Sequence, residues 1–224
     1  MRILIDTANV EQIKEMYDAG VICGATTNPT LIAKEGKVFE ETLQEIIEIF
    51  QGDEDSLIFA EAVSLESGAI VEEAKKLAAK SPNIIVKIPM CREGIKAVHA
   101  LSKEGIRTAV TLVFTPIQAL LAANAGASFV APFVGRLDDI CSDGVQTVRD
   151  ICDIFRVQNC STQVLCASLK QPYHVEQMAK AGAGYATIPY AALKMCFEHP
   201  LSEKGIEMFM ADWDKLQKET AKQG

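Results

Sequence analysis

Short apolar runs alternate with amphipathic stretches along most of the chain. The runs are rich in β-branched residues and bounded by turn residues, which is typical of strands buried on both faces. We expect eight strands, near residues 3–6, 22–26, 57–62, 84–88, 108–112, 129–133, 163–167 and 185–188. Between them, apolar residues recur at helical spacing near 10–17, 43–50, 95–101, 119–123, 145–155 and 175–181. Gly20 is the expected stop of the first helix.

Eight strands that alternate with helices favour a parallel α/β fold, and their number fits a (β/α)8 TIM barrel at the compact end of its size range. An open doubly wound sheet is the alternative. No G-x-G-x-x-G follows the first strand, so dinucleotide binding has less support. The length suits one large core, and we expect a single barrel domain over residues 1–224.

Two further helical stretches, near residues 191–197 and 202–218, follow the eighth strand. The second has an apolar stripe formed by Ile206, Phe209, Met210, Trp213 and Leu216. Helices that follow the strands already close a barrel, so this stripe would pack under its own barrel or on a neighbouring subunit. We favour contact between the 202–218 helix and a neighbouring subunit.

Composition excludes several classes of partner. A net charge of −8 disfavours nucleic acid, which binds basic surfaces. The apolar runs are far shorter than the roughly 20 residues of a membrane helix, and no signal segment opens the chain, so we expect a cytoplasmic protein with no membrane contact. Seven cysteines without a C-x-x-C predict small, mostly buried thiols in a reducing compartment. The three histidines lie far apart, and no metal site is predicted.

One lysine interrupts a strand that is otherwise apolar. Lys87 lies in the run I-I-V-K-I-P over residues 84–89, and Pro89 cannot donate a ladder hydrogen bond, so strand pairing should fade there. Burial disfavours the ammonium, so Lys87 could lose its proton and act as an amine nucleophile. Pairing with a buried carboxylate, or reaching out to the surface, explains the same hexapeptide equally well.

Nearly every predicted strand delivers a polar residue at its carboxyl end, where barrels build their active sites. These residues are Asp6, Thr26, Asn28, Glu61, Lys87, Thr111, Arg136, Ser168 and Lys170. Taken singly, each of four of these residues would more simply cap a helix: Asp6, Thr26, Asn28 and Ser168. Glu61 is harder to dismiss, because its neighbours are apolar and an unpaired buried carboxylate is costly. Together the set predicts a carbonyl site: an amine that adds to a ketone, carboxylates that move protons, and an arginine that binds phosphate.

At these residues the chain resembles the transaldolase family, in its small single-domain branch, which includes fructose-6-phosphate aldolase. The resemblance spans nearly the whole length. Its motifs are I-D-T-A at 5–8, G-A-T-T-N-P at 24–29, V-K-I-P at 86–89, T-L-V-F at 111–114, A-P-F-V-G-R at 131–136 and D-W at 212–213. The T-T-N-P and V-K-I-P segments at this separation are the strongest signal.

The resemblance implies a class I aldol mechanism on a (β/α)8 barrel, without metal or cofactor. Lys87 would form the Schiff base, Asp6 would accept the proton of the C4 hydroxyl, and Glu61 with Thr111 would hold the proton-shuttling water. The remaining implied site residues would bind substrate: Asn28 the donor hydroxyls, with Thr26 lining the same pocket, and Arg136 and Ser168 the phosphate, with Lys170 as a helper. The partners would be sugar phosphates and further copies of the chain, since members of this branch are usually decamers of two pentameric rings whose last helix reaches a neighbour.

Two positions distinguish the activities of this branch. Transaldolases resemble the chain in having glutamate at Glu61 and phenylalanine at Phe133, where the aldolases have glutamine and tyrosine. Without a hydroxyl at position 133, water is held less well, and the bound three-carbon unit should survive until an acceptor arrives. Ala131 departs from this pattern, since transaldolases often have serine there.

We therefore expect a transaldolase of the pentose phosphate pathway that moves a dihydroxyacetone unit from sedoheptulose 7-phosphate or fructose 6-phosphate to an aldose phosphate. The alternative is a fructose-6-phosphate aldolase that releases free dihydroxyacetone and glyceraldehyde 3-phosphate. A non-catalytic barrel that binds sugar phosphates is the third hypothesis.

Overall fold

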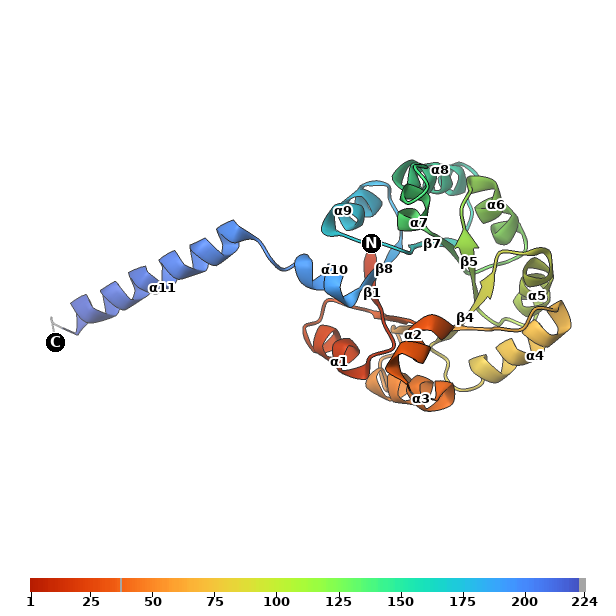
Figure 1. Cartoon of the computed structure of the whole chain (residues 1–224), viewed down its shortest axis with the longest axis horizontal. Coiled ribbons are helices and arrows are strands. Elements are labelled where there is room, and N and C mark those ends of the chain that lie inside the picture. The colour runs from red at the N-terminus through yellow and green to blue at the C-terminus, as the bar shows by residue number, and fades with distance from the viewer. Residues whose placement is uncertain (37, 222–224) are drawn as a thin grey trace.

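The chain forms a closed barrel of eight parallel strands, and the computed structural model describes residues 1–36 and 38–221. The strands are β1 (Arg2–Asp6), β2 (Gly24–Thr26), β3 (Leu57–Glu61), β4 (Ile84–Pro89), β5 (Thr108–Val113), β6 (Phe129–Pro132), β7 (Gln163–Cys166) and β8 (Tyr185–Pro189). Each strand pairs with the next in sequence, and β8 pairs with β1. Helices surround the ring of strands (Figure 1). The predicted (β/α)8 barrel is confirmed. Residues 37 and 222–224 of the domain expected over 1–224 lie outside the described residues.

The helices, nine between the strands and two after β8 in the described part of the chain, follow the predicted pattern with additions. They are α1 (Val10–Asp18), α2 (Pro29–Glu35), α3 (Phe39–Ile49), α4 (Ser67–Ala78), α5 (Arg92–Lys103), α6 (Pro116–Asn124), α7 (Val134–Asp138), α8 (Gly144–Val157), α9 (Pro172–Lys180), α10 (Tyr190–Met195) and α11 (Pro200–Thr220). Gly20, at φ +71°, follows the end of α1, as predicted. The helical patterns did not include α2, α4 or α7. The five residues of α7 are too few to show a period.

Side chains alternate between two apolar layers along each strand. One set fills the barrel interior, and its members are Leu4, Leu57, Phe59, Ile85, Ala109, Phe129 and Leu165. The other set packs between the barrel and the helices and includes Ile5, Val86 and Val110. Because the period is two, the residue two positions beyond an interior residue also points inward, one layer nearer the carboxyl ends. This places Asp6, Glu61, Lys87 and Thr111 in the layer above the apolar interior.

The cysteines correct one expectation. Only Cys166 is buried among the seven, which are all free thiols, and Cys91, Cys141 and Cys196 are exposed. Two of the exposed cysteines cap helices and the third lies in a turn: Cys91 is the N-cap of α5, where its Sγ accepts a hydrogen bond from the Gly94 amide, Cys196 is the C-cap of α10, and Cys141 lies between α7 and α8. The prediction of mostly buried thiols is wrong because it ignored helix caps and turns, where side chains reach solvent.

The last helix stands apart from the barrel (Figure 1). No residue of α11 is buried, and its apolar side chains, including Phe209 and Trp213, are exposed. Packing under its own barrel, one of the two alternatives for this stripe, is therefore not what the structure shows. Among the described residues, no helix combines the length and apolar character that crossing a membrane requires.

Candidate active site

A small cavity of about 140 Å³ opens at the carboxyl ends of the strands. It is lined by Asp6, Thr26, Asn28, Lys87, Thr111, Ala131, Phe133, Arg136, Leu165, Ala167, Ser168 and Thr187. The structure thus brings together all the predicted site residues except Glu61 and Lys170. Glu61 contacts Lys87 from the side, and Lys170 lies outside the cavity.

Lys87 is buried and paired. Only 7 % of the residue is exposed, and its Nζ lies 3.0 Å from Glu61 Oε2 and donates a hydrogen bond of 2.9 Å to the Thr27 carbonyl. The pair follows from strand register, since Glu61 of β3 stands directly opposite Lys87 of β4. This contact with Glu61 is the pairing with a carboxylate that the sequence offered as an alternative explanation for Lys87. It also gives the amine a neighbouring carboxylate that can accept its proton.

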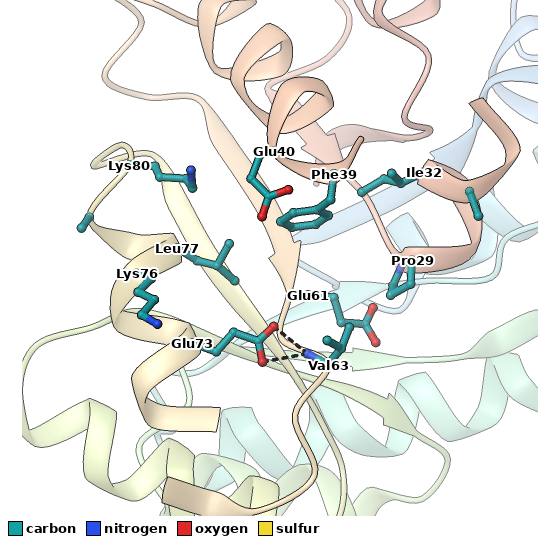
Figure 2. Close-up of a pocket in the computed structure, with 12 residues that line it drawn as sticks. Pro29, Ile32, Phe39, Glu40, Glu61, Val63, Glu73, Lys76, Leu77 and Lys80 are labelled. Carbon is teal, nitrogen blue, oxygen red and sulfur yellow. Dashed lines mark hydrogen bonds between the residues drawn. The ribbon is translucent and has the colours of Figure 1, made fainter. Parts of the chain in front are cut away.

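On its other side, Glu61 borders a groove between α2, α3 and α4 (Figure 2). The groove measures about 900 Å³ and is lined mainly by apolar side chains such as Ile32, Phe39 and Leu77. The loop that follows Glu61 is fixed by Glu73 of α4, whose carboxylate accepts hydrogen bonds from the backbone amide of Val63 (Figure 2). Glu61 therefore has a fixed backbone and a side chain at the boundary between the cavity and the groove.

Asp6 belongs to a chain of hydroxyl groups. Thr26 Oγ1 donates to Asp6 Oδ1 at 2.8 Å and lies 2.6 Å from Thr187 Oγ1. Since the Thr26 proton is directed to Asp6, the Thr187 hydroxyl must donate to Thr26. Burial raises the pKa of Asp6 above its ordinary value, and the Thr26 hydrogen bond and the nearby Lys87 charge only partly offset this rise. A carboxylate so poised is suited to take up a proton.

Thr111 has a buried hydroxyl without a partner. Among the described residues, its Oγ1 and that of Thr108 are the buried side-chain oxygens that lack a hydrogen bond. Thr111 lines the cavity, where β5 is irregular: its register with β6 shifts between Val110 and Val113, and Leu112 adopts φ +60°. A buried hydroxyl without a partner beside a cavity is a ready binding group for a substrate oxygen or a water.

Asn28 combines the capping and the binding interpretations. It is the N-cap of α2, and its side-chain oxygen accepts a hydrogen bond of 3.0 Å from the Leu31 amide. Its side-chain amide nitrogen remains able to donate into the cavity that the residue lines. Asp6, by contrast, does not cap α1, because Asn9 occupies that position.

The cations predicted to bind phosphate differ in placement. The Arg136 guanidinium stacks over the Phe133 ring at 5.0 Å from its centroid, and both residues line the cavity with Ser168. Lys170 instead forms an exposed ion pair with Asp139. Arg136 and Ser168 thus line the cavity, whereas Lys170 has a partner outside it.

Sequence reasoning missed Thr187 and the carbonyl of Thr27. Thr187 occupies an inward position of β8, two residues beyond Tyr185, and a hydroxyl in the apolar run 185–188 was a usable signal of the same kind as Thr111. The Thr27 carbonyl left no signal in the sequence, since every residue has one. No group of three or more His, Cys, Asp or Glu side chains in the described part of the chain could hold a metal ion.

A family model described as transaldolase/fructose-6-phosphate aldolase matches residues 3–220. The chain belongs to this family. A relative from Brevibacillus brevis, named "probable transaldolase", is 52% identical over 218 residues, which cover 97% of this chain and all of the relative. A relative from Clostridioides difficile, also named "probable transaldolase", is 53% identical over 214 residues, which cover 96% of this chain and 97% of the relative. A third of the same name, from Desulfitobacterium hafniense, is 51% identical over 216 residues, which cover 96% of this chain and all of the relative. The family resemblance stated from the motifs is thus confirmed.

Proposed function

We propose that the protein is a transaldolase that moves a dihydroxyacetone unit from a ketose phosphate to an aldose phosphate through a Schiff base on Lys87. The donor would be sedoheptulose 7-phosphate or fructose 6-phosphate, as in the pentose phosphate pathway of the cytoplasm. One observation carries the proposal: a buried lysine, 3.0 Å from a carboxylate, faces a cavity that a second carboxylate also lines. The names of the relatives support the same activity.

Imine formation would use Lys87 and Glu61. Glu61 accepts a proton from the Lys87 ammonium, and the free amine adds to the C2 carbonyl of the donor to give a carbinolamine. Glu61 returns this proton to the carbinolamine hydroxyl, which leaves as water, and the nitrogen lone pair turns the N–C2 single bond into the double bond of an iminium ion. Thr111 would hold that water, and its buried hydroxyl without a partner supports this role.

Carbon–carbon cleavage would use Asp6. Its carboxylate takes the proton of the C4 hydroxyl as the C3–C4 bond breaks, and the bond's electron pair passes into the iminium to form an enamine. The aldose product leaves, and an acceptor aldehyde then receives the enamine's electron pair while Asp6 returns the proton. Asn28 would hold the hydroxyls of the bound three-carbon unit, and Arg136 and Ser168 would bind the phosphate.

The transferase and lyase hypotheses differ in the fate of the enamine. Glyceraldehyde 3-phosphate release from fructose 6-phosphate should depend on added erythrose 4-phosphate. A coupled assay with and without this acceptor measures the dependence. Sustained release without an acceptor would assign the chain to the lyase class instead.

The side chain at position 133 can be changed to test the same distinction between transferase and lyase. Phe133→Tyr should raise the release without an acceptor about 2- to 10-fold, because a hydroxyl at the cavity wall would hold the hydrolytic water through one hydrogen bond. Phe114 is a matched control. The centroid of its ring lies 5.8 Å from that of the Phe133 ring, but Phe114 is not part of the cavity lining. Phe114→Tyr should leave the release unchanged. An equal effect of the two substitutions would remove Phe133 as the determinant of the activity.

We further propose that the chain assembles with copies of itself through α11. The support is the exposed stripe of Ile206, Phe209, Met210, Trp213 and Leu216 on a helix with no buried residue. An apolar face of this length is normally covered in a soluble protein. Sedimentation velocity should show an assembly larger than one chain, and the double substitution Phe209→Ser and Trp213→Ser should dissociate it. Asp212→Ala, on the polar side of α11, is the control. A wild-type monomer, or equal assembly of all variants, would contradict the proposal.

A further inference from the structure

The groups placed to bind an anion stand on two short segments. Arg136 lies on α7, and Ser168 lies in the loop between β7 and α9. Ser168 has φ +60°, a strained value for serine that persists only where its surroundings fix it. At one end the segments are joined by backbone hydrogen bonds of 3.0 Å from the Gly135 amide to the Ser168 carbonyl and from the Val134 amide to the Ala167 carbonyl.

These segments approach so closely that position 135 accepts only glycine. A Cβ atom there would lie 2.3 Å from the Ser168 carbonyl oxygen. Arg136 is the next residue, so the spacing of the two segments decides how far its guanidinium stands from the Ser168 hydroxyl. These backbone hydrogen bonds lie at the start of α7, and a second link joins its far end to the same loop.

His174 of α9 supplies that link. Its side chain is 8 % exposed, its Nε2 lies 3.1 Å from Asp138 Oδ2, and its Nδ1 accepts a hydrogen bond of 3.3 Å from the Lys170 amide. An accepting Nδ1 has no proton, so Nε2 carries it and donates to Asp138. The other Asp138 oxygen accepts from the Gly144 amide at 3.0 Å. His174 thus holds α7 by a side chain two residues beyond Arg136 and the loop by a backbone amide two residues beyond Ser168.

We propose that His174 is a positioning residue for the anion site: its one neutral tautomer sets the spacing between Arg136 and Ser168 that a phosphate group requires. This inference deepens the proposed function, on which it rests for the identity of the anion as a sugar phosphate. The parallel link, from Lys170 to Asp139, is exposed and screened by solvent, so it fixes the segments less firmly.

Two substitutions separate the contacts of His174. Glutamine can place its amide nitrogen where Nε2 lies and keep the bond to Asp138, whereas asparagine can place its oxygen where Nδ1 lies and keep the bond from Lys170. Each variant therefore loses one half of the link. We expect His174→Gln and His174→Asn each to raise KM for fructose 6-phosphate, and the calorimetric Kd for inorganic phosphate, about 10-fold. The rate at which borohydride traps dihydroxyacetone on Lys87 should stay within about 2-fold of wild type. His99→Ala, an exposed histidine on α5, should change none of these values.

A double-substitution cycle tests whether His174 acts through Arg136. Arg136→Ala alone should raise KM for fructose 6-phosphate about 10- to 100-fold, because a hydrogen-bonded charge is lost. Adding His174→Gln to Arg136→Ala should then raise this KM by less than about 2-fold, since there is no guanidinium left to position. Independent 10-fold losses in both backgrounds would overturn the proposal. Two other results would also overturn it. One is an equal loss of reaction with fructose 6-phosphate and with dihydroxyacetone, and the other is failure of both His174 variants to fold. Either result would show that the role of His174 is purely structural.

Failure of the proposed function gives a different result. If wild-type protein forms no borohydride adduct, the Schiff-base mechanism fails, but the calorimetric Kd for inorganic phosphate still compares wild type with the His174 variants. A 10-fold change in that Kd would then keep His174 as the positioning residue of an anion site whose chemistry differs from the one proposed. An unchanged Kd, or no phosphate binding by wild type, would overturn the inference.

Discussion

Lys87→Met should lower transaldolase turnover by about four orders of magnitude or more and abolish the adduct that borohydride forms with fructose 6-phosphate. Methionine matches the length and the apolar stem of lysine but has no amine, so the covalent route is closed while the cavity keeps its shape. Turnover by the coupled assay and the mass of the trapped protein measure the two effects. No other group in the cavity lining is an amine.

The substitution also leaves Glu61 without the ammonium that it contacts at 3.0 Å. A partly buried carboxylate without a partner is destabilising, so the double variant Lys87→Met with Glu61→Gln keeps the fold testable. Lys96→Met is the matched control, since Lys96 is exposed on α5 and pairs with Glu93. It should trap and turn over like wild type. An adduct on another lysine in the Lys87→Met variant would refute the assignment.

The barrel could be predicted from the sequence because its strands carry their own signal. Apolar runs such as 84–89 occupy the strand positions, and a strand's period of two fixes which side chains share a face. Once the carboxyl end of the sheet is known to hold the site, Lys87 and Glu61 follow as residues of one layer. The register that sets them directly opposite one another depends on barrel closure, and it appears only in the structure.

The features that escaped prediction depend on contacts between distant segments. Thr187 gains its role from Thr26, 161 residues away, and His174 from Asp138 on another helix. The five-residue helix α7 has no period of its own and is held by the loop beside it. Local patterns indicate elements, but only the closed barrel shows which polar groups become partners.

The charged residues in the layer above the apolar interior affect the stability of the folded protein. Glu61 and Lys87 offset one another's charge, whereas Asp6 has a hydroxyl partner and forms no ion pair among the residues that the structure describes. Its raised pKa shows that burial outweighs the groups that favour the ionised form. A group whose pKa rises on folding favours the folded state while protonated, and this contribution is lost as the pH rises through the folded-state pKa. Above its raised folded-state pKa, ionised Asp6 therefore lowers the stability of the protein.

Asp6→Asn should consequently reduce activity and raise stability together. Asparagine keeps the oxygen that accepts from Thr26 but cannot take up the proton of the C4 hydroxyl, so we expect kcat to fall about 10²- to 10⁴-fold. The Schiff base should still form, and borohydride should trap the donor intact. The melting temperature should exceed that of wild type at pH 7, and the gap should close as the pH falls through the raised pKa of Asp6 toward its ordinary value of 3.8, because wild-type Asp6 then becomes neutral.

Thermal unfolding of wild type and Asp6→Asn between pH 4 and pH 8 measures this difference in melting temperature. The control is Asp18→Asn, at an exposed position that ends α1, which should alter neither stability nor kcat. Wild-type kcat for cleavage should decline over the same pH interval in which the stability gap closes, since both effects report one carboxyl group. A gap that persists at low pH would attribute the stability change to packing rather than to charge. A normal kcat in Asp6→Asn would transfer the role of proton acceptor to Glu61, the other carboxylate at the site.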